Sequence, residues 1–181
     1  MINLNSPVYE SPWNPGYQWK HALLQYLSWK FHLRAFIETG THWGGTLNAM
    51  QPHFDQLYSI ELSELWYGHA VEMFGINGNV HLIHGNSAVE LPKLLERIPN
   101  EPALFWLDAH YSGGDTACAA EDPLLAEVQT IVRMRPNALI VIDDMQPGDH
   151  FGSFGKPDGW KCLFHGGVVI MHKGVYDISF S

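Results

Sequence analysis

Residues 36–50, FIETGTHWGGTLNAM, join a short apolar run to a run with helical spacing through a loop rich in glycine. Glycine lets the backbone adopt positive φ and approach a ligand closely. A helix that follows such a loop offers unpaired N–H donors in its first turn. The pattern Glu38-x-Gly40-x-x-x-Gly44-x-Thr46 therefore suits a ligand-binding turn, although any strand-to-helix connection can use glycines in this way. Its spacing differs from the GxGxxG of dinucleotide sites, which disfavours a dehydrogenase.

Apolar runs with the length of a strand buried on both faces recur along the chain. They are RAFIETG (34–40), QLYSIEL (56–62), NVHLIHG (79–85), ALFWLDAH (103–110) and ALIVIDDM (138–145). Helical runs separate them, and this alternation predicts βαβ units in a parallel sheet. The closing GWKCLFHGGVVIMHKG (159–174) is predicted to form an antiparallel hairpin around Gly166-Gly167. The expected fold class is α/β, with seven mostly parallel strands and helices on both faces.

Three helices are predicted from the sequence, and for two of them a signal marks the start. Residues 17–32 carry leucines at 23, 24 and 27, which is helical spacing. The run from Ser87 opens with Ser-x-x-Glu, a capping-box signature. In the run from Asp122, Pro123 is expected at the first helical position.

Length, charge and cysteine content narrow the class of protein. A chain of 181 residues fits one domain. A net charge of −9 without any basic stripe argues against nucleic-acid binding. No apolar run reaches the ~20 residues of a membrane helix, and the N-terminus lacks the pattern of a signal peptide. Cys118 and Cys162 lie far apart, which suggests a reducing compartment. We therefore expect a soluble, cytoplasmic protein that contacts neither nucleic acid nor membrane.

Polar residues stand at the end of every predicted parallel strand, where ligands bind in open parallel sheets. They are Glu38-Thr39-Gly40, Glu61, His84 to Ser87, Asp108 to His110, and Asp143-Asp144. Glu61 follows the glycine loop by roughly twenty residues, the position where an acidic side chain typically binds ribose hydroxyls. Taken alone, Glu61 would better fit a solvated carboxylate or a helix cap. Together with the loop, it favours a ribose-containing ligand.

In this order the segments resemble the class I S-adenosylmethionine-dependent methyltransferases. ETGTHWGGT, YSIEL, HGNSAVEL, FWLDAHY and IVIDDM resemble five successive motifs of that superfamily, and the resemblance extends over about residues 34–172. It implies a Rossmann-like fold, S-adenosylmethionine as cofactor, and methyl transfer as activity. The implied cofactor-binding catalytic domain is 34–181, and we expect an arm and helix at 1–33 to belong to the same domain, where they could cap the substrate.

Cofactor roles carry over from the resemblance by position. Gly40 and Gly44 would line the methionine moiety, and Glu38 would lie close to its amino group. Glu61 would hold the ribose hydroxyls. Asn86 and Ser87 would lie beside the adenine, although relatives often have Asp at position 86. The implied cofactor-binding set is completed by Thr41, Thr46 and Asp108.

Asp108, Asp143 and Asp144 form a second group, because carboxylates at the ends of neighbouring strands converge. Three unpaired carboxylates would repel one another, and a hard divalent cation such as Mg²⁺ would relieve this. Similar acidic sets occur in metal-dependent O-methyltransferases of the catechol and antibiotic-sugar groups. There the metal binds two substrate oxygens and lowers the pKa of the one to be methylated. Alternatively, one Asp caps a turn and the others are solvated.

The predicted catalytic residues are Asp108 and His110. A histidine two residues past Asp108 could accept the proton of an acceptor hydroxyl, with His150 as a weaker candidate. Either histidine could equally be structural. Tyr17 and Trp19 could cap the pocket, or Trp19 could pack in a dimer contact or against the sheet.

The function hypothesis is metal-assisted O-methylation of a small molecule, with the hydroxyl of a sugar, polyol or phenol as acceptor. Two alternatives stay open: a non-catalytic S-adenosylmethionine-binding module, and a metal-dependent hydrolase that uses the Asp/His set. The sequence also leaves homo-oligomerisation open.

Overall fold

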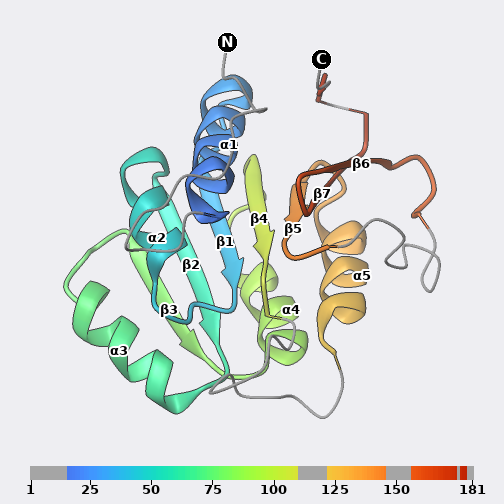
Figure 1. Cartoon of the computed structure of the whole chain (residues 1–181). Coiled ribbons are helices and arrows are strands. Elements are labelled where there is room, and N and C mark those ends of the chain that lie inside the picture. Colours follow the sequence, from blue (N-terminus) through green and yellow to red (C-terminus); the bar gives the residue numbers. More distant parts are fainter. Residues whose placement is uncertain (1–15, 110–121, 146–155, 175, 179–181) are drawn as a thin grey trace.

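The computed structural model describes residues 16–109, 122–145, 156–174 and 176–178 (Figure 1). The helices are α1 (Gly16–Phe31), α2 (Gly45–Met50), α3 (Glu64–Phe74), α4 (Ser87–Arg97) and α5 (Leu124–Met134), with a 3₁₀ turn η1 (Gln51–His53) after α2. The strands are β1 (Ala35–Thr39), β2 (Gln56–Glu61), β3 (Val80–His84), β4 (Ala103–Leu107), β5 (Leu139–Ile142), β6 (Lys161–His165) and β7 (Val168–His172). Within these ranges no helix is long and apolar enough to cross a membrane.

The strands form one seven-stranded sheet in the order β3-β2-β1-β4-β5-β7-β6. The five strands β1 to β5 pair in parallel, and β7 pairs antiparallel with both β5 and β6. The chain moves outward from β1 to β3 and then returns to the other side of β1 with β4. Strand order therefore reverses between β1 and β4, which is where ligands bind in such sheets. The predicted fold class is confirmed.

Helices cover both faces of this sheet, with α1, α2 and α3 on one face and α4 and α5 on the other (Figure 1). Alternate residues of a strand point to opposite faces. In β1, Phe36 packs on the α1–α3 side, whereas Ala35 and Ile37 pack on the α4–α5 side. The predicted leucines of the first helix are all buried on the α1–α3 side: Leu23, Leu24 and Leu27. Helix α1 is therefore part of the same core as the sheet.

Two helix caps differ by one residue from the sequence-based predictions. The N-cap of α4 is Asn86, which is extended and whose Oδ1 accepts a hydrogen bond from Ala88 N (2.9 Å). The capping-box prediction at Ser87 was wrong, because Ser87 is already helical and a better acceptor precedes it. In α5 the first helical residue is Leu124, and Pro123 is its N-cap. Asp122 Oδ1 accepts from Leu124 N (2.9 Å) and so satisfies a free donor of the first turn.

The C-terminal hairpin is confirmed as predicted. Gly166 and Gly167 connect β6 to β7 and both have positive φ, +55° and +87°. Two consecutive positive φ values are what a two-residue hairpin turn with the right twist requires, and glycine adopts them without strain. The hairpin places β7 against β5, so that β5 lies inside the sheet and all of its residues are buried.

Candidate functional site

The loop after β1 passes very close to the end of β4. Gly40 has a φ of +82°, and a Cβ at this position would lie only 2.6 Å from the backbone oxygen of Asp108. The register explains this approach, since Thr39 pairs with Leu107 and Asp108 N donates to Thr39 O (3.0 Å). Only glycine fits here, because any side chain would collide with backbone. The glycine predicted from the pattern is thus required at the strand-order reversal.

Gly44 has a different structural cause. Its φ is +72°, and a Cβ would lie 2.8 Å from the ring of Phe74 on α3. The positive φ and the packing against α3 together account for this glycine. Thr46, two residues later in α2, is buried, and its Oγ1 lies 3.3 Å from Nε2 of His21 on α1. The two later positions of the motif therefore connect the loop to α3 and α1.

Glu61, the last residue of β2, fixes the backbone around it. Its Oε2 accepts a hydrogen bond from His42 N (2.9 Å) and its Oε1 accepts one from Ser63 N (2.8 Å). The carboxylate thus joins the loop after β1 to the start of α3. His42 has a φ of +47°, a costly conformation for a residue other than glycine, and the bond to Glu61 helps to stabilise it. A carboxylate has about four acceptor positions, so Glu61 can still accept ligand hydroxyls.

Glu38 lies on β1 opposite Ser59 of β2 and is almost completely buried. Ser59 Oγ donates to Glu38 Oε2 (2.6 Å), and Thr41 Oγ1 lies 2.6 Å from the same hydroxyl. Burial raises the pKa of Glu38 to about 8; the bond from Ser59 opposes this rise, and the charge of Glu61 adds to it. At neutral pH this carboxyl is mostly protonated. A cationic ligand group beside it would favour its ionised form.

Asn86 and Ser87 stand where β3 passes into α4. The Asn86 side-chain oxygen caps the helix, as described above, and Ser87 is buried. Ser87 and Thr39 face Glu127 of α5, which is 1% exposed. Burial raises the pKa of Glu127 to about 7, and the hydroxyls of Ser87 and Thr39 oppose this rise. Among the described residues, Oε1 of Glu127 has no hydrogen-bond partner.

Asp108, Asp143 and Asp144 come together as predicted. Asp143 N donates to Leu107 O (3.0 Å), which aligns the ends of β4 and β5, and one oxygen of each aspartate lies within 4.8 Å of the others. Burial raises the pKa of Asp108 well above its ordinary value, and the charges of Asp143 and Asp144 raise it further. Asp144 has a φ of +49°, and its N–H donates to Asp143 Oδ1 (2.7 Å).

The three carboxylates are not all unpaired, which corrects the prediction. Lys20 of α1 forms an ion pair with Asp143, and its Nζ lies 3.1 Å from Oδ1 of Asp144. The side chain of Lys20 is 9% exposed and that of Asp143 is fully buried. Burial alone would lower the pKa of Lys20, but the carboxylates of Asp143 and Asp144 raise it above its ordinary value. The cluster thus contains a cation of its own.

A divalent metal fits the donor chemistry of this cluster. Three carboxylates on two adjacent strand ends are the oxygen ligands that Mg²⁺ prefers. Asp143 Oδ2 is buried and has no hydrogen-bond partner among the described residues, so this oxygen is available as a metal ligand. Lys20 engages the other oxygen of Asp143. A metal at this site would therefore bind next to an ammonium group.

His110 and His150, the predicted base and its weaker alternative, lie outside the described residues. Trp19 is described, and it packs against the hairpin: a Cβ on Gly166 would lie 3.1 Å from its ring, and its ring centroid lies 5.9 Å from that of His165. The alternative in which Trp19 packs against the sheet is thus the one observed.

Sequence reasoning missed Lys20, His21, Ser59 and Glu127. Lys20 carried a usable signal, because it precedes Leu23 and Leu24 by three and four residues and so lies on the apolar stripe of its helix. A lysine whose ammonium is buried at such a position needs a counterion. Ser59 and Glu127 carry no comparable signal, since their partners come from elements distant in sequence.

Solved structures with a similar fold include three methyltransferases. The methyltransferase PaMTH1 of Podospora anserina, solved with S-adenosylhomocysteine, has a TM-score of 0.63 and 16% sequence identity, over 86% of this chain and 78% of that chain. An O-methyltransferase from Bacillus cereus, also in complex with S-adenosylhomocysteine, has a TM-score of 0.60 and 16% identity, over 92% and 83%. The N-methyltransferase NodS from Bradyrhizobium japonicum has a TM-score of 0.60 and 13% identity, over 90% and 97%.

A scan of family models and a search of curated proteins each find no match to this chain. At these low identities the structural similarity concerns the fold. The strand order, the antiparallel hairpin and the solved neighbours together define that fold: the chain has the class I methyltransferase fold. The resemblance seen in the sequence is confirmed at this level.

Proposed function

We propose that this protein is an S-adenosylmethionine-dependent methyltransferase. The observation that carries the proposal is the close approach of Gly40 to the end of β4. Residue 40 can have no side chain there, so the backbone is not covered by one at the strand-order reversal. Three carboxyl groups of this region influence one another electrostatically: the charge of Glu61 raises the pKa of Glu38, and the charge of Glu38 raises that of Asp108. S-adenosylmethionine carries an ammonium group, ribose hydroxyls and an activated methyl on a sulfonium. The carboxyl groups can accept hydrogen bonds from the ammonium and from the ribose hydroxyls.

Each residue has a role in this proposal. Glu38 accepts from the amino group of the ligand and becomes ionised on binding. Glu61 accepts from the ribose hydroxyls while it holds the backbone at His42. Asn86 and Ser87 flank the adenine at the start of α4, and Gly40, Thr41, Gly44 and Thr46 form the loop around the methionine moiety. Asp108, whose backbone lies against Gly40, would help to align donor and acceptor, and such alignment supplies much of the rate acceleration.

The finer proposal is transfer to a hydroxyl oxygen of a small molecule such as a sugar, polyol or phenol. Asp108, Asp143 and Asp144 would hold a divalent cation that lowers the pKa of that hydroxyl, and His110 would take its proton. The acidic cluster supports this assignment. The fold leaves the acceptor atom open, because its solved neighbours include both an O-methyltransferase and an N-methyltransferase.

Calorimetric titration with S-adenosylhomocysteine, without added metal, tests cofactor binding. We expect binding by the unaltered protein and at least about tenfold weaker binding by Glu61→Gln, which loses a charge-assisted acceptor. Glu64→Gln is the matched control, because Glu64 is exposed in the first turn of α3. No heat from the unaltered protein at millimolar ligand would exclude the proposal and leave the hydrolase alternative.

Catalysis is tested by transfer of a labelled methyl group from S-adenosylmethionine to catechol, glycerol and a hexose, each with and without Mg²⁺. Transfer to one of them that rises with Mg²⁺ supports metal-assisted O-methylation. Normal cofactor binding with no transfer to hydroxyl or amine acceptors would instead indicate a binding module.

A further inference from the structure

We propose that Lys20 is the resident cation of the acidic cluster at Asp108, Asp143 and Asp144, and that its ammonium group competes with a divalent metal for these carboxylates. This inference rests on the proposed function in one respect, because the divalent metal belongs to that function. The ion pairs that carry it exist independently of any cofactor.

The position of the ammonium is the first argument. Lys20 Nζ contacts Asp143 Oδ1 and lies 3.1 Å from Asp144 Oδ1. These two oxygens belong to two of the three residues whose donors converge. A cation bridging the same two oxygens would occupy the space of the ammonium. A metal must therefore displace Lys20, or bind through the other oxygens with Lys20 beside it.

Charge gives the second argument. When all three carboxylates are ionised, as metal ligands must be, the ammonium reduces the net charge of the cluster from −3 to −2. The cluster then attracts a divalent cation less strongly than three carboxylates alone would. Because the Lys20 side chain is 9% exposed and Asp143 is fully buried, water screens their mutual interaction only weakly. A cation within a few ångströms of a metal site under such conditions weakens metal binding substantially.

The third argument is that the residues before and after Lys20 both anchor α1 to neighbouring elements. Trp19 packs on Gly166 of the hairpin, and His21 lies 3.3 Å from Thr46 of α2. Three successive residues of α1 thus contact the hairpin, the end of β5 and α2. Moving the helix away from the cluster would break all three contacts. A metal that displaces the ammonium would therefore do so through a rotamer change of the Lys20 side chain, with the first turns of α1 in place.

Metal affinity measured by calorimetry with Mn²⁺ and Mg²⁺, in the absence of any cofactor, tests this competition. We expect Lys20→Met to bind metal at least about tenfold more tightly than the unaltered protein, given the size of charge–charge coupling at such distances. Lys20→Arg retains the charge and is expected to bind as weakly as the unaltered protein. Equal affinity in the unaltered protein and Lys20→Met would overturn the proposal.

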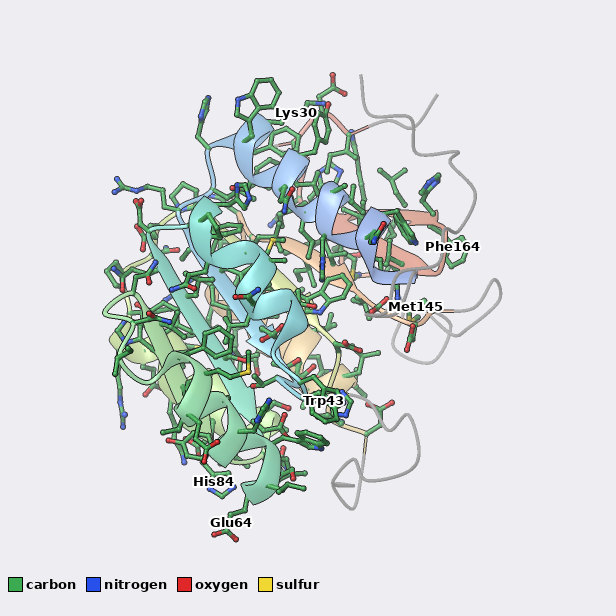
Figure 2. The ribbon with its side chains drawn as sticks, turned by 60° about the vertical axis from the view of Figure 1, so that its left-hand side comes forward. Lys30, Trp43, Glu64, His84, Met145 and Phe164 are labelled. Carbon is green, nitrogen blue, oxygen red and sulfur yellow. The ribbon has the colours of Figure 1, made fainter. Side chains whose placement is uncertain are left out.

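Lys30→Met is the matched control, since it removes the same charge from the same helix. Lys30 Nζ donates to the backbone oxygen of Asp177 (2.8 Å), and Figure 2 shows Lys30 at the far end of α1 from Met145, the residue after Asp144. Its metal affinity should equal that of the unaltered protein. If Lys30→Met tightens metal binding as much as Lys20→Met does, the effect is one of net charge and the proposal fails.

A measurement on the unaltered protein keeps the inference testable if Lys20→Met does not fold. Acetylation by limiting acetic anhydride, read out by mass spectrometry, should modify Lys20 slowly and Lys93 quickly, because Lys93 is an exposed partner of Glu90. Saturating Mn²⁺ should raise the rate at Lys20 at least about threefold relative to Lys93 if the ammonium is displaced. An unchanged ratio, at a metal concentration that calorimetry shows to be saturating, would overturn displacement of the ammonium, and unchanged affinity in Lys20→Met would overturn the competition as a whole. Failure of S-adenosylhomocysteine binding would leave both results unaffected.

Discussion

Lys20 and Asp144 are 124 residues apart in the sequence, and their Nζ and Oδ1 atoms lie 3.1 Å apart. The contact joins the first helix to the end of β5, and Asp143 accepts from the same ammonium. It turns a group of repelling carboxylates into a partly neutralised one. It also places a side chain from the N-terminal helix directly at the acceptor side of the proposed site.

Removing Lys20 should destabilise the protein markedly. Lys20→Met leaves Asp143 buried without its cation, and breaking one side of a buried pair typically costs about 3–5 kcal/mol. The double variant Lys20→Met/Asp143→Asn should recover a large part of this loss, because it removes the uncompensated charge. The free energy of unfolding in urea provides the measurement. A double variant no more stable than Lys20→Met would show that the loss comes from packing.

Gly40→Ala should impair both stability and cofactor binding. The new methyl group would lie 2.6 Å from Asp108 O at a φ of +82°, so backbone must move. We expect a loss of about 2 kcal/mol or more in the free energy of unfolding and at least about tenfold weaker S-adenosylhomocysteine binding. Gly45→Ala is the control, since a Cβ there meets nothing within 4 Å. Equal effects of the two substitutions would mean that the close approach is unimportant.

Cofactor binding should release a proton from Glu38. Its pKa of about 8 keeps it mostly protonated at pH 7 in the free protein, and the ligand ammonium favours the carboxylate and so lowers this pKa. Affinity should therefore rise with pH up to about 8 and then level off. Calorimetry at pH 7 in buffers of different ionisation enthalpy measures the released protons.

Glu38→Gln removes the titrating group and is the control for this linkage. The variant should bind more weakly and release fewer protons than the unaltered protein. Unchanged proton release in Glu38→Gln would assign the linkage to another group.

The stability of the ligand-free protein should fall between about pH 5 and pH 8. The pKa of Glu127 is about 7 in the folded state, above the ordinary value of 4.5, because burial favours the neutral form. Its stabilising effect is complete below 4.5 and is lost as the pH rises through 7. Glu127→Gln stays neutral and should flatten this decline by roughly 2 kcal/mol. Urea unfolding at pH 5, 6, 7 and 8 measures it, with the exposed Glu72→Gln as control; equal slopes in all three proteins would contradict it.

Local patterns were sufficient to predict the order of the elements. The buried strands read as apolar runs, and β1, β4 and β5 are indeed buried along their whole length. Helix starts were less certain, because several polar residues next to one another can each cap a helix, as Asn86 and Ser87 illustrate. The convergence of the three aspartates could also be predicted, because parallel strands end at one edge of the sheet.

The α/β class, the hairpin and the position of the glycine loop could all be predicted, because each depends on residues close together in the chain. The pairing of the buried charges and the contact that requires each glycine could be found only from the three-dimensional arrangement. Lys20 meets Asp143 although strands β1 to β5 lie between them in the sequence, and Gly44 is explained by the ring of Phe74. Such pairings follow from the packing of α1 and α3 onto the sheet, and Coulomb forces depend on distances in space, which spacing along the chain does not specify.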